Sequence, residues 1–266
     1  MDWLAHEPVL RLTAFAGVFA LMAGWEAWRP ARARLRSRRL RWSNNLGLVA
    51  LNTLILRVAF PTAAVGFALV AQERGWGLFN RLDWSGGFEL VLAVILLDLA
   101  IYAQHVAFHA TPWLWRLHRM HHSDVDLDVT SGARFHPLEI LLSMVIKLVV
   151  VAVLGPDPVA VLLFEIVLNA SAMFNHANIS LPVRIEPLVR ALFVTPDMHR
   201  THHSVRPEET HSNFGFNLSI WDRVFRTYCA EPQEGRARLV LGLPTFRSAK
   251  EAWVWPLITQ PFRQGE

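Results

Sequence analysis

Two nearly identical stretches decide what this chain can be: HRMHHS at residues 118–123 and HRTHHS at residues 199–204. Twelve histidines occur in the chain, and most of them lie in or near these two stretches. In each copy the histidines stand at positions i, i+3 and i+4, the spacing that places three side chains on one side of an α-helix. This repeated pattern predicts a metal site assembled from distant parts of the chain.

A further pair of histidines precedes the first stretch. His105 and His109 stand four residues apart at the end of an apolar run, so a helix would present both imidazoles on one face. Thr111–Pro112 and Thr195–Pro196 precede the two stretches, and each predicts a new helix with an N-cap threonine and a proline in its first turn. Three helical segments would then carry eight histidines in total.

These eight imidazoles are too many for a single ion. Neutral imidazole nitrogen suits Fe, Zn, Cu or Ni, and one ion takes about four to six such ligands. Two ions that share eight or nine nitrogens are therefore the natural count. A lone histidine on an apolar face is more often a core residue with satisfied hydrogen bonds, but eight at a repeated helical spacing favour a metal site.

The composition is that of a membrane protein. Of the 266 residues, 53% are hydrophobic and only 18% are charged, and eleven are tryptophan. The single cysteine, Cys229, excludes an internal disulfide and a cysteine-based zinc or iron–sulfur site. Metal binding must therefore depend on the histidines.

Long apolar runs divide the chain into membrane spans and polar segments. Spans are expected at about residues 9–28, 46–70 and 88–104, followed by a hairpin at 138–174 that breaks at GPDP (155–158). The histidine-rich segments 105–137 and 176–266 would lie outside the spans. We therefore predict an all-α, polytopic membrane bundle, one domain over residues 1–266, whose histidine-rich helical cap holds a di-metal site.

Charge sets the expected orientation of these spans. Seven arginines crowd the segment between the first two spans: Arg29, Arg32, Arg34, Arg36, Arg38, Arg39 and Arg41. They favour a cytoplasmic loop that fixes topology over a nucleic-acid patch, because apolar spans flank them on both sides. Asp2 and Glu7 precede the first span, so an uncleaved span with its N-terminus outside is expected. Both HRxHHS copies then fall on the cytoplasmic face.

Asp98, Lys147 and Glu165 are charged residues that lie within apolar runs, where charge is costly. Lys147 and Glu165 stand on opposite arms of the hairpin, where they either form an ion pair or lie separately near the membrane boundaries. Asp98 precedes His105 by seven residues, two helical turns on the same face.

Here the sequence resembles the integral-membrane fatty acid hydroxylase and sterol desaturase superfamily. Its pattern of HxxxH, HxxHH and HxxHH occurs as HVAFH (105–109), HRMHH (118–122) and HRTHH (199–203), in that order. The resemblance covers about residues 91–228 and includes RFHPLE (134–139) and NFGFNLSIWDRVFRTY (213–228). The gap between the first two boxes is similar to that of the branch containing alkylglycerol monooxygenase and its bacterial relatives.

The resemblance implies a set of metal ligands. The expected ligands are His105, His109, His118, His121, His122, His199, His202 and His203, with His176 in FNHAN as a ninth. A ligating imidazole usually donates its other N–H to a partner. The candidate partners are Asp98, Asp124, Asn175, Asn178, Asp197 and Asn213, with Asp98 favoured. The roles of His136 and His211 stay open.

The resemblance also implies a reaction. Members of the superfamily bind two iron ions and use O2 to hydroxylate or desaturate an unactivated C–H bond of a lipid such as a fatty acyl, sterol-like or alkyl-ether chain. Electrons would come from a separate haem or iron–sulfur carrier, or from a pterin, because no dinucleotide-binding motif occurs in the chain. The sequence leaves open the lipid, the carbon attacked, the electron donor and the oligomeric state.

Two other functions compete with this one. A membrane metallohydrolase could use the same histidines, but no HExxH motif supplies its activating carboxylate. A metal transporter or other metal-binding membrane protein would place histidines along a path within the spans, whereas most of these lie beyond the span ends. No nucleic-acid partner is expected.

Overall fold

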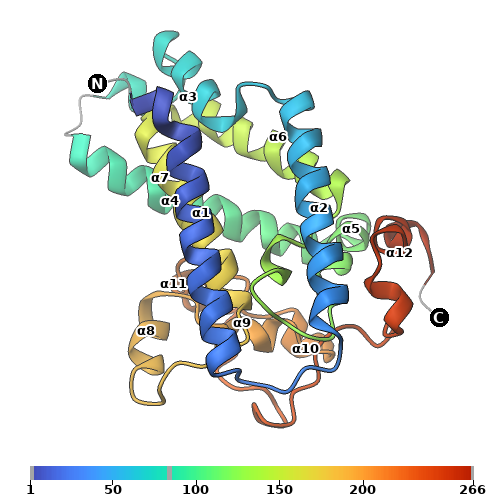
Figure 1. Cartoon of the computed structure of the whole chain (residues 1–266). Helices are drawn as coiled ribbons and strands as arrows, with labels where there is room; N and C mark the ends of the chain where they lie inside the picture. Colours follow the sequence, from blue (N-terminus) through green and yellow to red (C-terminus); the bar gives the residue numbers. More distant parts are fainter. Residues whose placement is uncertain (1–2, 83–85, 265–266) are drawn as a thin grey trace.

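The computed structural model describes residues 3–82 and 86–264, and within them the fold is helical (Figure 1). Among these described residues, pairing of extended chain is limited to two isolated bridges, Phe193–Leu218 and Ser204–Leu241. The long helices are α1 (Trp3–Trp28), α2 (Arg38–Ala59), α3 (Ala63–Glu73), α4 (Gly86–Ala110), α6 (Pro137–Leu154) and α7 (Pro158–His176). The shorter helices are α5 (Pro112–His122), α8 (Glu186–Leu192), α9 (Pro196–His202), α10 (Pro207–Thr210), α11 (Ile220–Val224) and α12 (Val254–Thr259).

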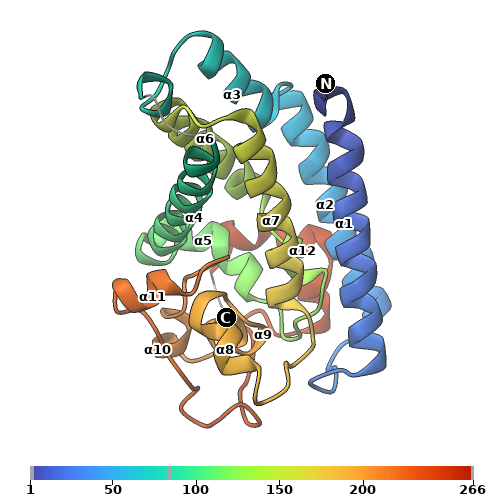
Figure 2. The same cartoon turned by 90° about the vertical axis from the view of Figure 1, so that its left-hand side faces the viewer.

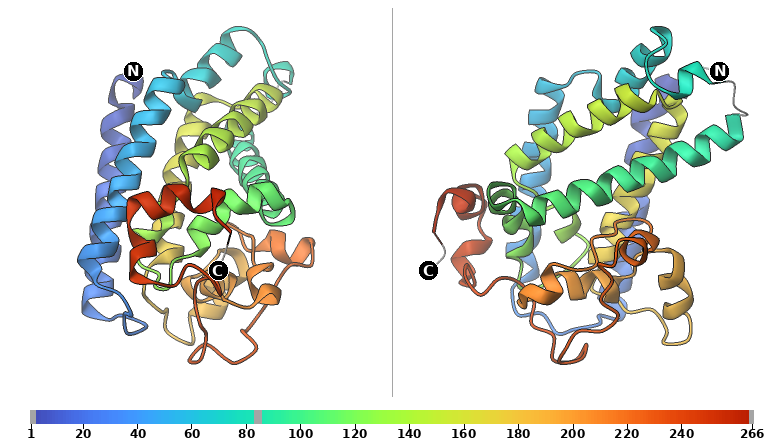
Figure 3. Two further views of the ribbon diagram at one scale, coloured as in Figure 1. Left: turned by 90° about the vertical axis from the view of Figure 1, so that its right-hand side faces the viewer. Right: turned by 180° about the vertical axis from the view of Figure 1, so that it is seen from behind.

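Within residues 3–82 and 86–264, five segments are long and apolar enough to cross a membrane. They are His6–Trp28, Arg38–Glu73, Gly86–Ala110, Pro137–Leu154 and Pro158–His176. The prediction of an all-α polytopic bundle with a histidine-rich cap is therefore confirmed. The short helices gather at one end of the bundle, and α4 runs obliquely toward them (Figures 2 and 3).

The expected second span differs in detail from the structure. A single run over residues 46–70 was expected, but α2 already begins at Arg38, and the chain breaks between Ala59 and Ala63. Pro61 lies in this break, and a proline inside a helix removes a backbone hydrogen bond and clashes with the preceding turn. The chain therefore turns, and α3 continues in a new direction (Figure 1).

The first turns of α2 bury three polar side chains, those of Arg41, Asn44 and Asn45. Arg41, expected in an exposed basic loop, is only 1% exposed and binds Asp124 through Nη2 at 2.7 Å and Ser131 at 2.9 Å. Asn45 donates to Thr130 Oγ1 at 2.9 Å. These contacts fasten α2 to the loop that follows α5, so the start of this helix supports the histidine-bearing segment.

The hairpin of α6 and α7 closes through ordinary turn chemistry. Gly155 ends α6 in the left-handed conformation, with φ +62°, and the Asp157 side chain accepts from Val159 N to cap α7. Lys147 and Glu165 form an ion pair at 2.5 Å, and Arg11 of α1 binds the other oxygen of the same carboxylate, also at 2.5 Å. Of the two arrangements that the sequence left open for Lys147 and Glu165, the structure therefore shows the ion pair.

Candidate metal centre

Four helices end or begin at the histidine cluster. His105 and His109 lie in the last turns of α4, and His176 is the last residue of α7. The predicted helix starts are confirmed: α5 begins at Pro112 and α9 begins at Pro196. Thr195 caps α9 by accepting from Met198 N, whereas Thr111 makes no side-chain cap hydrogen bond.

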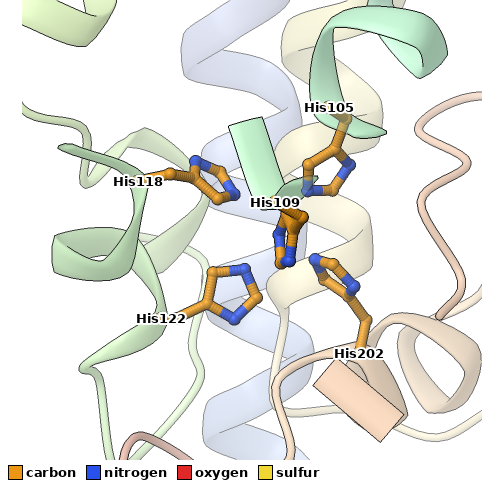
Figure 4. Close-up of side chains that lie close together, drawn as sticks. All are labelled: His105, His109, His118, His122 and His202. Carbon is orange, nitrogen blue, oxygen red and sulfur yellow. The ribbon is translucent and has the colours of Figure 1, made fainter. Parts of the chain in front are cut away.

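The structure brings the nine predicted histidines together in two groups. The first group is His105, His109, His118, His122 and His202, and the second is His121, His176, His199 and His203. Within each group, one ligand atom per residue lies within 4.8 Å of all the others. Figure 4 shows that the five rings of the first group point toward one another from three helices, α4, α5 and α9. All nine side chains are buried.

The division into groups does not follow the sequence motifs. His121 and His122 are neighbours in the chain, yet they belong to different groups, and the same holds for His202 and His203. Adjacent residues of a helix point in directions about 100° apart, so two neighbouring histidines can face two different sites. Each HxxHH motif therefore contributes to both groups.

The positions of the ring nitrogens support a metal in both groups. In the first group the Nε2 atoms of all five histidines are buried without a hydrogen-bond partner. In the second group the Nε2 atom of His176 lies 3.1 Å from that of His121 and 3.0 Å from that of His199. Two nitrogens bound to one ion at about 2.0–2.1 Å lie roughly 3 Å apart. The two groups of histidines therefore fit two metal ions better than they fit a network of hydrogen bonds between imidazoles.

Burial also keeps these histidines ready to bind a cation. Burial lowers the pKa of His121, His122 and His199 well below the usual value of 6.5, and the pKa values of His202 and His203 fall in the same way. Neighbouring imidazoles lower these pKa values further. Neutral rings at pH 7 offer their lone pairs to a metal without first losing a proton.

Most partners of the remaining ring nitrogens are backbone carbonyls. His105 Nδ1 lies 2.8 Å from Phe214 O, and His202 Nδ1 lies 2.7 Å from Ser212 O. His176 Nδ1 lies 2.7 Å from Ala172 O, one turn back in its own helix. A carbonyl can only accept, so these contacts place the proton on Nδ1 and leave Nε2 free to face the group.

Among the described residues, one carboxylate contacts the cluster, and it was not among the site residues predicted from the sequence. Glu139 Oε1 of α6 lies 2.6 Å from His118 Nδ1, and the side chain of Glu139 is buried. A carboxylate behind a ligating imidazole makes the ring more basic and fixes its orientation. The available signal was a carboxylate in the first turn of the helix that begins at Pro137, directly after the histidine-rich segment.

The acidic and amide residues expected to orient the histidines bind elsewhere in the described part of the chain. Asp98 accepts hydrogen bonds from Asn217 N, Leu218 N and Trp221 Nε1. The two amides bind backbone groups: Asn175 donates to Phe216 O, and Asn178 exchanges two hydrogen bonds with the backbone of Arg32. The other two carboxylates form ion pairs, Asp197 with Arg200 and Arg236, and Asp124 with Arg41. Spacing along α4 suggested Asp98, but backbone N–H groups of a distant loop satisfy this carboxylate instead. The expectation for Asp98 is therefore corrected.

Asn213 reaches the histidines through the backbone. It adopts a left-handed conformation, with φ +53°, and its side chain donates to Met198 O and Cys229 O. The carbonyls on either side of it, Ser212 O and Phe214 O, face His202 and His105. Its side chain thus holds the turn that presents both acceptors.

The two histidines with open roles differ in position. His136 caps α6 by accepting from Leu138 N, and its Nε2 lies 3.0 Å from Ile258 O, so it stands outside both groups. His211 is exposed, and its Nδ1 lies 3.3 Å from His109 Nδ1. His211 therefore lies between His109 and the solvent.

Gly132 offers a test of the four-histidine group. A Cβ at this position would lie 2.4 Å from Ala172 O, the acceptor of His176, and 3.1 Å from His176 Nδ1. We expect Gly132→Ala to displace His176 and to lower the metal content of the purified protein toward one ion per chain. Gly24→Ala is the control, since a Cβ there meets nothing within 4 Å. Full metal content in both variants would contradict the assignment of His176.

The chain is similar in sequence to several known proteins. The chain is 31% identical over 151 residues to the ornithine lipid hydroxylase OlsE of Rhizobium tropici, a match that covers 57% of this chain and 45% of that protein. It is 26% identical over 178 residues to human alkylglycerol monooxygenase, covering 65% of this chain and 38% of that protein.

A third relative and the family match extend this comparison. The chain is 25% identical over 150 residues to rat cholesterol 25-hydroxylase, covering 56% of this chain and 49% of that protein. The chain thus spans less than half the length of each of these three relatives. No solved structure matches it. The sequence model of fatty acid hydroxylases matches residues 90–227, which carry all nine clustered histidines, and the chain therefore belongs to the fatty acid hydroxylase family.

Proposed function

We propose that this protein is a membrane-bound, O2-dependent hydroxylase that inserts oxygen into an unactivated C–H bond of a lipid. The observation that carries the proposal is the convergence of nine buried imidazoles into two groups at one end of a membrane-spanning bundle. The three relatives described above are named for the hydroxylation or monooxygenation of an ornithine lipid, an alkylglycerol and cholesterol. Lipid is the class these substrates share.

Two iron ions are the cofactor we propose, one in each histidine group. When bound, they would activate O2 with two electrons from an external donor, so that R–H, O2, two electrons and two protons give R–OH and water. A ligand set of neutral imidazoles leaves most of the metal charge uncompensated, which favours the binding of reduced, anionic oxygen. Glu139 adds one carboxylate, and it lies behind His118 rather than within a group.

Aromatic side chains cover the histidine cluster and shield it from water. Phe135 stacks on His121 with ring centroids 4.6 Å apart, and Phe214 packs against His105 at 5.6 Å. Aromatic cover of this kind keeps bulk water from the histidines and stabilises their orientation. These residues would exclude side reactions of the activated oxygen with water.

The two competing functions fit less well. A metallohydrolase needs a carboxylate or similar base beside its metal, and both candidate groups in the described chain contain histidine alone. A transporter needs sites spaced along a path, whereas these nine residues form one compact cluster. Hydroxylation is favoured over desaturation because the relatives' names describe hydroxylases and monooxygenases.

Isotope labelling tests the proposed reaction. We expect iron-loaded protein in vesicles, supplied with a chemical reductant and 18O2, to form lipid products that carry one 18O atom in a new hydroxyl group, measured by mass spectrometry. His202→Ala should abolish these products. Product oxygen that derives from water would overturn the proposal and favour a hydrolase, and products without added oxygen but with a new double bond would favour a desaturase.

A further inference from the structure

Helix α8 is amphipathic, but its polar side faces inward. Glu186 and Arg190 are 3% and 5% exposed and form an ion pair at 2.5 Å. Thr195 donates to the same Glu186 carboxylate at 2.7 Å. On the opposite side, Leu188 is 74% exposed and Leu192 is 58% exposed. A helix surrounded by water would bury these leucines and expose the charges.

Exposed apolar side chains continue from α8 onto α11. We call the following set the α8–α11 face: Val183, Ile185, Leu188, Leu192, Phe193, Ile220, Val224 and Phe225. Two backbone hydrogen bonds tie its halves together, from Val194 N to Asn217 O and from Ser219 N to Leu192 O, each 3.0 Å long. The face is therefore one surface built from two short helices.

The exposed charges of α8, α11 and the residues next to them in sequence are basic. Arg184, Arg223 and Arg226 are exposed, whereas the acidic residues of the same helices, Glu186 and Asp222, are buried. Large exposed apolar patches rimmed by polar residues mark contact with a membrane or a protein. Exposed arginines beside an apolar surface match the anionic headgroups of phospholipids.

The face also adjoins one of the candidate membrane spans. Trp221 of α11 donates to Asp98 of α4 at 2.9 Å, and Phe225 stacks on Tyr102 of α4 with centroids 5.3 Å apart. Helix α4 is one of the five candidate spans. In Figures 1 and 2, α8 and α11 lie level with the lower half of α1 rather than beyond its end.

We propose that the α8–α11 face is embedded in the membrane leaflet on the histidine side, with its apolar side chains among acyl chains and its arginines at anionic headgroups. This inference rests on the membrane placement of the spans and is independent of the proposed chemistry. It revises the expectation that residues 176–266 lie largely outside the membrane. Thr195 both binds Glu186 of α8 and caps α9, so the helix that carries His199 and His202 lies directly behind the embedded surface.

Spin labels can measure the depth of this face in the full-length protein. Cys229 is the only cysteine, so Cys229→Ser provides the background. Labels would be attached to Leu188→Cys and Val224→Cys, both at exposed positions. Leu12→Cys on α1 serves as the membrane reference, and Ala237→Cys, exposed in a polar loop, serves as the aqueous reference. The protein would be placed in vesicles that contain anionic phospholipid.

Collision of each label with O2, which concentrates in the bilayer, and with a water-soluble nickel chelate distinguishes the environments. We expect the ratio of O2 to nickel accessibility at Leu188→Cys and Val224→Cys to match that at Leu12→Cys and to exceed that at Ala237→Cys several-fold. A ratio equal to that of Ala237→Cys would overturn the proposal. Low accessibility to both reagents, with dipolar broadening between labels, would overturn it in favour of a second copy of the chain.

Discussion

His121→Ala and His122→Ala, changes of adjacent residues, should each remove a different metal ion. His121 belongs to the four-histidine group and His122 to the five-histidine group. The purified protein should fall from two ions per chain to about one in either variant, and the double variant should fall to none. Lipid oxidation should be lost in all three, because the proposed reaction needs both ions. Elemental analysis against protein concentration measures the metal content.

His136→Ala is the matched control for these variants. His136 is buried and close in sequence, but it caps α6 and stands outside both groups. It should lower the melting temperature modestly and keep two ions per chain. Loss of both ions in either His121→Ala or His122→Ala, with the fold intact, would mean that the histidines form one inseparable site rather than two.

Glu139→Gln should weaken metal binding without removing any ligand. The change keeps the shape of the side chain but removes the negative charge behind His118. Loss of such a partner lowers metal affinity by about 10–100-fold. Competition with a chelator, using Co2+ as an optical probe, should show this loss for one of the two ions only, because Glu139 contacts a member of the five-histidine group.

Glu26→Gln serves as the comparison for Glu139→Gln. Glu26 is also buried, but it accepts from Val129 N and Asn178 N instead of a histidine ring. Its loss should change thermal stability and leave the Co2+ affinities and spectrum as they are in the unchanged protein. If both variants lose equal stability and neither changes Co2+ binding, Glu139 has only a structural role.

Local rules were enough to predict the helices that carry the histidines and, apart from the second span with its break at Pro61, the membrane spans. Twenty or so apolar residues must form a helix in a bilayer, and threonine–proline starts α5 and α9 by fixing the first turn. The spacing within each motif also places its histidines on connected faces of one helix. Their gathering at one end of the bundle follows from the order of spans along the chain.

Long-range packing determined what the sequence could not predict. Adjacent histidines such as His202 and His203 divide between groups according to how α9 is rotated against α4, α5 and α7. Asp98 was expected beside a histidine, but the segment 217–221 folds back onto α4 and donates three hydrogen bonds to this carboxylate. Glu139 and Arg41 were missed because their partners lie 21 and 83 residues away in sequence, respectively.

The metal content of the unaltered protein tests the central claim most directly. Protein purified in mild detergent, without added chelator, should contain two metal ions per chain, predominantly iron. One ion per chain, or none in protein that keeps its helical circular dichroism and its melting transition, would contradict the two-ion centre and the oxygenase that depends on it.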